Sequence, residues 1–118
     1  IKSFHLMYDM VKNKQAFISF VKEKNNQMVA AHFFYVFGAY CLFASSAIDP
    51  DMPSDCGIGH LGMWQVIKAS RHMGCRFIDM GQLRLTSNSS EKECNIALFK
   101  KGFGGRAVTV FRGTKTFL

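Results

Sequence analysis

The segment that most constrains the fold is residues 25–48, which contain no Asp, Glu, Lys or Arg. Its length would suit a membrane-spanning helix. However, the segment is dense in aromatic residues, and Gly38-Ala39 stands at its midpoint. Two apolar strands joined by a tight turn explain this pattern better than a helix does. We therefore predict strands at residues 28–37 and 40–47, buried on both faces, and no membrane span.

Helical patterns lie on either side of this expected hairpin. Apolar residues recur at helical spacing over residues 2–13 and again over residues 58–73. In the second of these helices, Leu61 and Trp64 belong to the expected core face. Gly74 follows directly and is a natural end point, because Gly readily adopts the left-handed conformation that ends many helices.

A third helix is expected to begin at Ser90. Ser90 and Glu93 have the spacing of a capping box, and the helical pattern continues to about Lys101.

A helix that connects two neighbouring strands of one sheet requires those strands to be parallel. The sequence therefore predicts a mixed α/β fold, with further strands at residues 16–22, 76–80 and 106–112.

The composition is typical of one folded domain. Hydrophobic residues make up 48% and charged residues 19% of the 118 residues, which suits a single core. We expect residues 1–118 to form one domain and, because the chain begins at Ile1 and not at Met, to be a fragment of a longer chain. The four cysteines form no Cys-x-x-Cys pair, which fits neither a zinc site nor a disulfide framework and favours a cytoplasmic location.

Positive charge is concentrated in the C-terminal part of the chain. Residues 1–67 hold five Lys and five acidic residues, whereas residues 68–118 hold ten Lys or Arg and three acidic residues, which leaves +7 there. A basic half attracts polyanions such as nucleotide phosphates or RNA. A solvated basic surface without a partner would have the same composition, so the charge leaves both interpretations open.

A glycine-rich loop precedes the helix expected at residues 58–73. Gly residues at such a place let backbone N–H groups converge on a phosphate, and the helix N-terminus adds partial positive charge. The spacing Gly-x-Gly-x-x-Gly also fits a dinucleotide-binding loop, but the repeating βαβ context of that loop is absent. An ordinary loop that uses Gly for turns is the alternative. The candidate phosphate-binding residues are Cys56, Gly57, Ile58, Gly59, His60 and Gly62.

Asp79 lies at the C-terminal end of the strand predicted at residues 76–80. Open α/β sheets place their ligands at this edge of their parallel strands. Asp79 is therefore a candidate general base, although an Asp carboxylate more commonly accepts hydrogen bonds from loop amides. Gly81 would allow a turn or a close backbone approach. His32 interrupts an apolar strand and is expected to be a hydrogen-bonded core residue, not a base.

These features together resemble the C-terminal part of the Fem-like acyltransferases, a branch of the GNAT superfamily. The resemblance rests on the strand end Asp79-Met-Gly81 and on the segment Phe-Lys-Lys-Gly-Phe-Gly at residues 99–104, and it covers residues 27–112. It implies a GNAT-like mixed central sheet with helices on both faces, lacking the first strand and the first helix. The chain departs from the usual GNAT pyrophosphate loop at Ser54, where that loop has Arg or Gln.

The resemblance also implies an enzyme, an N-acyltransferase in which an amine attacks the acyl carbon of the donor directly. The donor would lie between the strand that ends near Ala47 and the strand that ends at Asp79. In Fem-like enzymes the Phe-Lys-x-x-Phe-Gly segment lines the catalytic cleft, which implicates Lys100 in stabilising the oxyanion or in holding a donor phosphate. Lys100 and Asp79 are thus the candidate catalytic residues.

Two donors and a non-catalytic alternative stay open. The donor is either an acyl-CoA such as acetyl-CoA, suggested by Gly57 and Gly59, or an aminoacyl-tRNA, suggested by the Fem-like segment and the basic half. The implied acceptors are small-molecule or peptidoglycan-precursor amines, with no tightly bound cofactor and no metal. The alternative is a GNAT-like module that binds RNA or another polyanion without catalysis, and Ser54 favours this alternative.

Overall fold

The computed structural model describes residues 2–53, 56–82, 88–111 and 113–116. The chain divides into two compact units, Ile1–Gly81 and Gln82–Leu118, which we call the first unit and the second unit and describe separately. The expectation of a single domain over residues 1–118 stays a prediction. No helix in the described part of the chain is long and apolar enough to cross a membrane.

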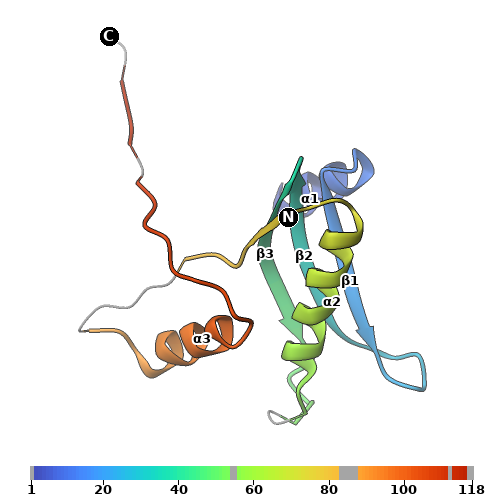
Figure 1. Ribbon diagram of the computed structural model, residues 1–118. Coiled ribbons are helices and arrows are strands. Elements are labelled where there is room, and N and C mark those ends of the chain that lie inside the picture. Colours follow the sequence, from blue (N-terminus) through green and yellow to red (C-terminus); the bar gives the residue numbers. More distant parts are fainter. Residues whose placement is uncertain (1, 54–55, 83–87, 112, 117–118) are drawn as a thin grey trace. The chain divides into compact units, whose positions relative to one another are not determined.

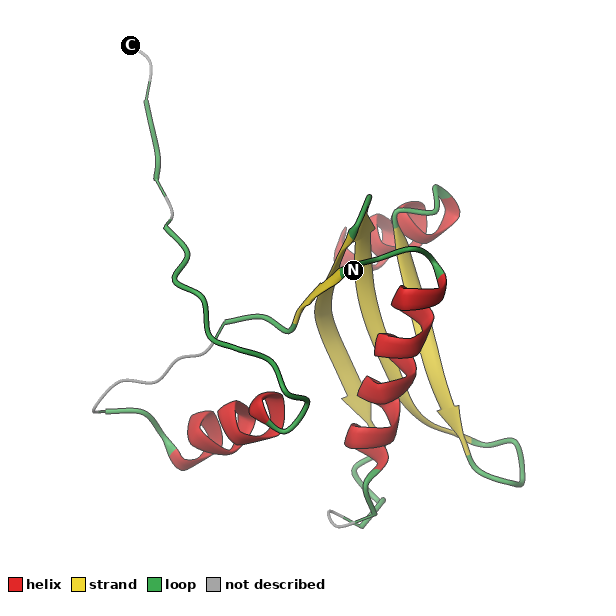
Figure 2. Cartoon of the chain, viewed as in Figure 1, coloured by secondary structure: helices red, strands yellow, loops and turns green. Residues whose placement is uncertain are grey.

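The first unit is a four-stranded sheet with a helix on each face (Figures 1 and 2). The strand order is β1-β2-β3-β4, in which β1, β2 and β3 are antiparallel neighbours and β4 is parallel to β3. In the view of Figure 1, α2 crosses the front of the sheet and α1 lies behind it. The elements are α1 (Lys2–Lys12), β1 (Ala16–Lys22), β2 (Met28–Phe37), β3 (Tyr40–Ile48), α2 (Ile58–His72) and β4 (Phe77–Asp79).

The uncharged segment forms the hairpin that its sequence predicts. β2 and β3 pair as far as Phe37 and Tyr40, and Gly38 turns the chain with a φ of 57°, which is the left-handed region that Gly tolerates. Within this pair the register shifts, because Phe33 lies opposite Ser45 whereas Phe34 lies opposite Phe43. Ala44 is therefore the extra residue of a β-bulge in β3.

The core of the first unit lies between α2 and the sheet, and its composition corrects two expectations. The helix turns Met63 and Val66 inward, whereas Leu61 and Trp64 are 47% and 51% exposed, so the predicted core face of this helix was wrong. Apolar residues surround much of α2, so periodicity alone does not decide which side packs. The expectation that both strands are buried on both faces holds for much of β2, but in β3 residues 44–48 are exposed.

In its described part, the second unit contains the helix α3 (Glu91–Lys101), and residues 105–111 and 113–116 have no regular structure. The predicted capping box is confirmed: the Ser90 hydroxyl accepts a hydrogen bond from the Glu93 N–H at 3.2 Å, and the Ser90 N–H donates to the Glu93 carboxylate at 3.3 Å.

The strand predicted at residues 106–112 was wrong over its described part. Residues 106–111 pair with no strand of the described chain, and Val110 is 83% exposed. Arg112 lies outside the described residues. Alternating apolar residues make a strand only where a neighbouring strand supplies hydrogen bonds and a core covers one face, and the pattern itself carries no information about either.

Candidate functional site

The first part of the candidate site is an open edge of β3. β4 pairs with only the first three residues of β3, from Tyr40 opposite Phe77 to Leu42 opposite Asp79. β3 continues to Ile48, so its residues 43–48 have β2 on one side and no strand among the described residues on the other. Backbone N–H and C=O groups on such an edge are available to a ligand. We call residues 43–48 the open edge.

The bulge at Ala44 lies within this open edge. A β-bulge interrupts the regular ladder and changes the direction of the neighbouring backbone groups, and bulges are frequent next to active sites. The side chains from Ala44 to Ala47 are small and exposed. The open edge therefore offers backbone hydrogen-bonding groups with little side-chain bulk around them.

The second part is the N-terminus of α2. Its N-cap, Gly57, has φ 72° and ψ 13°, and no described side chain caps the helix there. The Gly57 carbonyl accepts a hydrogen bond from the Leu61 N–H at 2.9 Å, and the N–H groups of Ile58 and Gly59 precede this first bond of the helix. The first turn also contains no acidic residue. This helix end presents N–H groups and partial positive charge to an anion.

The two parts lie at the same end of the sheet. Ile58, the first residue of α2, packs in a buried cluster with Ala30 of β2. Ala30 in turn lies opposite Ile48, the last residue of β3. The helix N-terminus and the C-terminal end of the open edge are therefore neighbours, as a donor that contacts both would require.

The candidate phosphate-binding residues do not have equivalent surroundings. Cys56 and His60 are exposed, whereas the side chain of Ile58 is buried in the core and leaves only its backbone to a ligand. Gly62 is buried against the sheet, which gives it a packing role. Ser54, the position at which the loop departs from the usual GNAT pattern, lies outside the described residues. Phosphate binding by this loop stays a prediction.

Asp79 is exposed, and its carboxylate accepts a hydrogen bond from the Gly81 N–H at 2.7 Å. Gly81 has a φ of 89°, which favours Gly and allows the turn that brings this N–H back to the carboxylate. Asp79 thus makes the loop contact that is the common use of Asp, at the end of the strand that borders the open edge. Its role as a general base stays a prediction.

Lys100 lies in the last turn of α3, in the second unit. Its ammonium donates a hydrogen bond to the carbonyl of Gln82 at 2.8 Å, within the same unit. Lys101 follows on the exposed side of the helix. The rings of Phe99 and Phe103 make an edge-to-face contact with centroids 5.2 Å apart, as their spacing predicts. The catalytic role of Lys100 stays a prediction.

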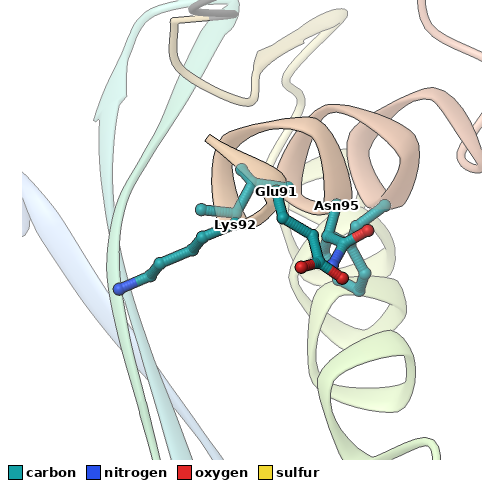
Figure 3. A pocket seen from close by; sticks show the side chains of 5 residues that line it. Glu91, Lys92 and Asn95 are labelled. Atoms are coloured by element: carbon teal, nitrogen blue, oxygen red, sulfur yellow. The ribbon is translucent and has the colours of Figure 1, made fainter. Parts of the chain in front are cut away.

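A shallow hollow of about 480 Å³ lies on the second unit, along one face of α3 (Figure 3). Glu91 and Asn95 point toward one another there, and the Lys92 side chain extends away from them. Ile96 and Phe99 complete its lining. A surface formed by one helix offers little enclosure for a ligand, and the hollow includes none of the predicted site residues.

The surroundings of His32 differ from those that the sequence predicts. Its side chain is only 2% exposed, and neither ring nitrogen has a hydrogen-bond partner among the described residues, so the expected hydrogen-bonded histidine was wrong. Burial lowers the pKa of His32 below its ordinary value. A Cβ atom on Gly62 would overlap the imidazole. A Gly inside a helix is the one signal that the sequence offers for such a close approach.

The buried Cys41 is not suited to act as a nucleophile. Cys41 is fully buried, and burial, followed by the nearby Cys75, raises the pKa of its thiol to about 11. A thiol of that kind stays protonated and inert near neutral pH. Cys56 and Cys94 are exposed.

The sequence profile of the acetyltransferase (GNAT) domain matches residues 4–92, which is 89 of the 118 residues. The chain therefore belongs to the acetyltransferase (GNAT) domain family. Family membership supports acyl transfer in general and agrees with an open edge beside a helix N-terminus that no described side chain caps. None of the curated proteins matches the sequence.

Solved structures confirm the GNAT-like mixed fold. The crystal structure of an acetyltransferase from Trypanosoma brucei is 17% identical, with a TM-score of 0.65 over 97% of this chain and 77% of that one. Glucosamine-6-phosphate N-acetyltransferase from Arabidopsis thaliana is 10% identical, with a TM-score of 0.61 over 97% of this chain and 74% of that one. At such identities the likeness shows the fold alone.

Proposed function

We propose that this chain is an N-acyltransferase that takes its acyl group from an acyl-CoA, with acetyl-CoA as the simplest donor. The observation that carries the proposal is the adjacency of the open edge of β3 and the N-terminus of α2, whose N-cap is Gly57. The helix end would hold the donor pyrophosphate, because its N–H groups and dipole favour an anion. The open edge would take the rest of the donor and its thioester.

The reaction follows from these positions. A backbone N–H of the open edge donates to the thioester oxygen and stabilises the negative charge that develops there. The neutral amine of the acceptor forms the new C–N bond, the C–S bond breaks, and the electron pair leaves on the thiolate of CoA. The proton lost by the amine goes to Asp79 directly or through water, and a proton from solvent neutralises the thiolate. Holding donor and acceptor together supplies much of the rate enhancement.

The finer assignments belong to the same proposal. The Fem-like branch is supported by the match of Phe99, Lys100, Phe103 and Gly104 to the Phe-Lys-x-x-Phe-Gly pattern. In that branch Lys100 would add positive charge to the oxyanion or to a donor phosphate. The acceptor would be a small-molecule amine, with a peptidoglycan-precursor amine as the version that the Fem-like resemblance adds.

Salt dependence distinguishes the two donors. The second unit holds seven Lys or Arg and two Glu, a net +5, so the charge that could contact tRNA is concentrated there. A tRNA contact that neutralises many phosphates would lose roughly 10³-fold in affinity or more between 50 and 200 mM salt, whereas an acyl-CoA contact neutralises few phosphates and changes much less. A steep salt slope together with no acetyl-CoA binding would favour aminoacyl-tRNA, or the non-catalytic polyanion-binding module if no transfer to amines is detected.

Two matched substitutions of Gly57 test whether the N-terminus of α2 holds the donor pyrophosphate. Asn and Asp both tolerate the left-handed conformation better than other side chains, and both place an oxygen near the helix N-terminus. Only Asp brings a negative charge, which would repel a phosphate. We expect Gly57→Asp to weaken acetyl-CoA binding about tenfold relative to Gly57→Asn, measured by calorimetry. Equal affinities would show that no donor phosphate lies at this helix end.

Alkylation of Cys56 tests the same position without mutation. Cys56 and Cys94 are both exposed, but only Cys56 neighbours Gly57. Acetyl-CoA has no free thiol, so it does not consume iodoacetamide. Saturating acetyl-CoA should slow alkylation of Cys56 severalfold and leave Cys94 unchanged, as followed by peptide mass spectrometry. Equal rates at Cys56 with and without donor would contradict the proposed pyrophosphate site.

A further inference from the structure

His32 connects the two parts of the candidate site. It lies in the middle of β2, and its imidazole fills the space that a side chain on Gly62 of α2 would occupy. The same ring lies 6.0 Å, centroid to centroid, from the ring of Phe43, the residue before the bulge in β3. One buried side chain thus contacts the helix that carries the proposed phosphate anchor and the strand that carries the open edge.

The chemistry of this contact depends on the protonation state of the ring. The imidazole is buried, and neither Nδ1 nor Nε2 is hydrogen-bonded to any described residue. A neutral ring in this place behaves as a flat, nearly apolar filler. A protonated ring would have two donors and a full charge without an acceptor, which is costly in a buried site. It would also lie near the positive end of the α2 dipole.

The described groups around His32 offer the cation no compensation. The side of α2 that packs on the sheet consists of Ile58, Gly62, Met63, Val66 and Ser70. The ionisable residues of α2, which are His60, Lys68, Arg71 and His72, are exposed. In the two neighbouring strands, Lys22 of β1 is exposed and Cys41 of β3 is a buried thiol. In β2 itself, Tyr35 follows the register of Phe33, on the face away from His32.

We propose that His32 is a positioning residue for the donor site: the uncharged imidazole holds the first two turns of α2 against the sheet and beside the bulge of β3, and protonation of the ring releases them. The inference rests on the proposed function for its consequence, which is that donor binding weakens in acid. The acid-sensitive packing of α2 against the sheet does not depend on the proposed function and follows from the contacts of His32 with Gly62 and Phe43.

The sign of the pH dependence follows from linkage. Burial places the pKa of His32 in the folded protein below the 6.5 of an unfolded histidine. The contribution of the neutral ring to stability is therefore complete above pH 6.5 and declines as the pH falls below it, because the unfolded chain then gains a proton that the folded chain resists. At pH 5.5, one unit lower, the loss is at most about tenfold in the folding equilibrium constant.

The test compares the wild type with His32→Leu, and with His32→Met as a second apolar variant whose flexible side chain fits an irregular space if Leu does not. Urea unfolding and hydrogen exchange of the α2 amides are measured at pH 7.5 and 5.5, together with acetyl-CoA affinity. In the wild type we expect folding to weaken by up to about tenfold more than in the variants between these pH values. Exchange in the first turns of α2 should rise, and acetyl-CoA affinity should fall in parallel.

The wild type and the variants share every ionisable group except His32, and the donor is the same in each measurement. The difference in pH dependence between them therefore belongs to His32. Equal pH dependence of unfolding and of α2 exchange in wild type and variants would overturn the inference. If the wild type shows no acetyl-CoA binding at pH 7.5, the donor assignment fails on its own, and the unfolding and exchange measurements alone decide the role of His32.

Discussion

Gly62→Ala is the substitution for which the structure permits the most specific prediction. The added methyl group would overlap the His32 imidazole, which is buried and has the ring of Phe43 on another side. Forcing extra atoms into a packed interface costs about 1–3 kcal/mol, and the overlap of a methyl with a rigid ring places this case at the upper end. Replacing Gly with Ala inside a helix returns about 1 kcal/mol. The expected net loss is about 2 kcal/mol.

A double-mutant cycle measures the contact itself. Urea unfolding is followed for the wild type, Gly62→Ala, His32→Ala and the double variant, with the slope of each transition as a check that the unfolding remains two-state. In the His32→Ala background the methyl has room, so Gly62→Ala should stabilise the protein by about 1 kcal/mol from helix propensity. The interaction energy between the two sites is then about 3 kcal/mol. If Gly62→Ala had the same effect in both backgrounds, the contact between the α2 helix and His32 would not exist and the inference drawn from it would fail.

Four further predictions concern catalysis, donor binding and the stability of α3. Lys100→Met should lower kcat by roughly 10²-fold with the donor Kd nearly unchanged, whereas Lys101→Met should have little effect, and small equal effects at both would indicate a generic basic surface. Asp79→Asn keeps an oxygen for the loop amide and should lower kcat by roughly 10²-fold or more. Gly59→Val should weaken donor binding without unfolding the protein, and unchanged affinity would indicate an ordinary loop. Ser90→Ala should destabilise α3 by about 1 kcal/mol, visible as faster amide exchange in that helix alone.

Local signals in the sequence predicted the elements that depend on local chemistry. The hairpin of β2 and β3 follows from an uncharged run with a turn at Gly38, and the start of α3 follows from Ser90 and Glu93, because each is specified within a few residues. The face of α2 was not predictable in this way. Trp64 is the largest side chain of the helix, yet the side that packs is the one on which Gly62 allows the sheet to approach.

The candidate site also combines features that a local sequence signal predicts with features that depend on packing. The glycines at 57 and 59 stand next to a helix start, so their use as an anion site can be proposed from sequence. The contact between His32 and Gly62 joins residues 30 positions apart, and the bulge at Ala44 depends on the register of two strands. The bulge has no local signature, and a Gly inside a helix is the only local trace of the contact, because both arise only after β2, β3 and α2 have packed.

The helices α2 and α3 have different N-caps, and the difference bears on function. α3 satisfies its own N-terminus with the side chains of Ser90 and Glu93, and Glu91 adds further negative charge. α2 begins at Gly57 with no cap from any described side chain. A missing side-chain cap costs about 1 kcal/mol, and burial of Ile58 at the start of α2 supplies stability of the same order or more. Among the described residues, packing against the sheet and not a side-chain cap holds this helix end in place, which suits a site for an anion.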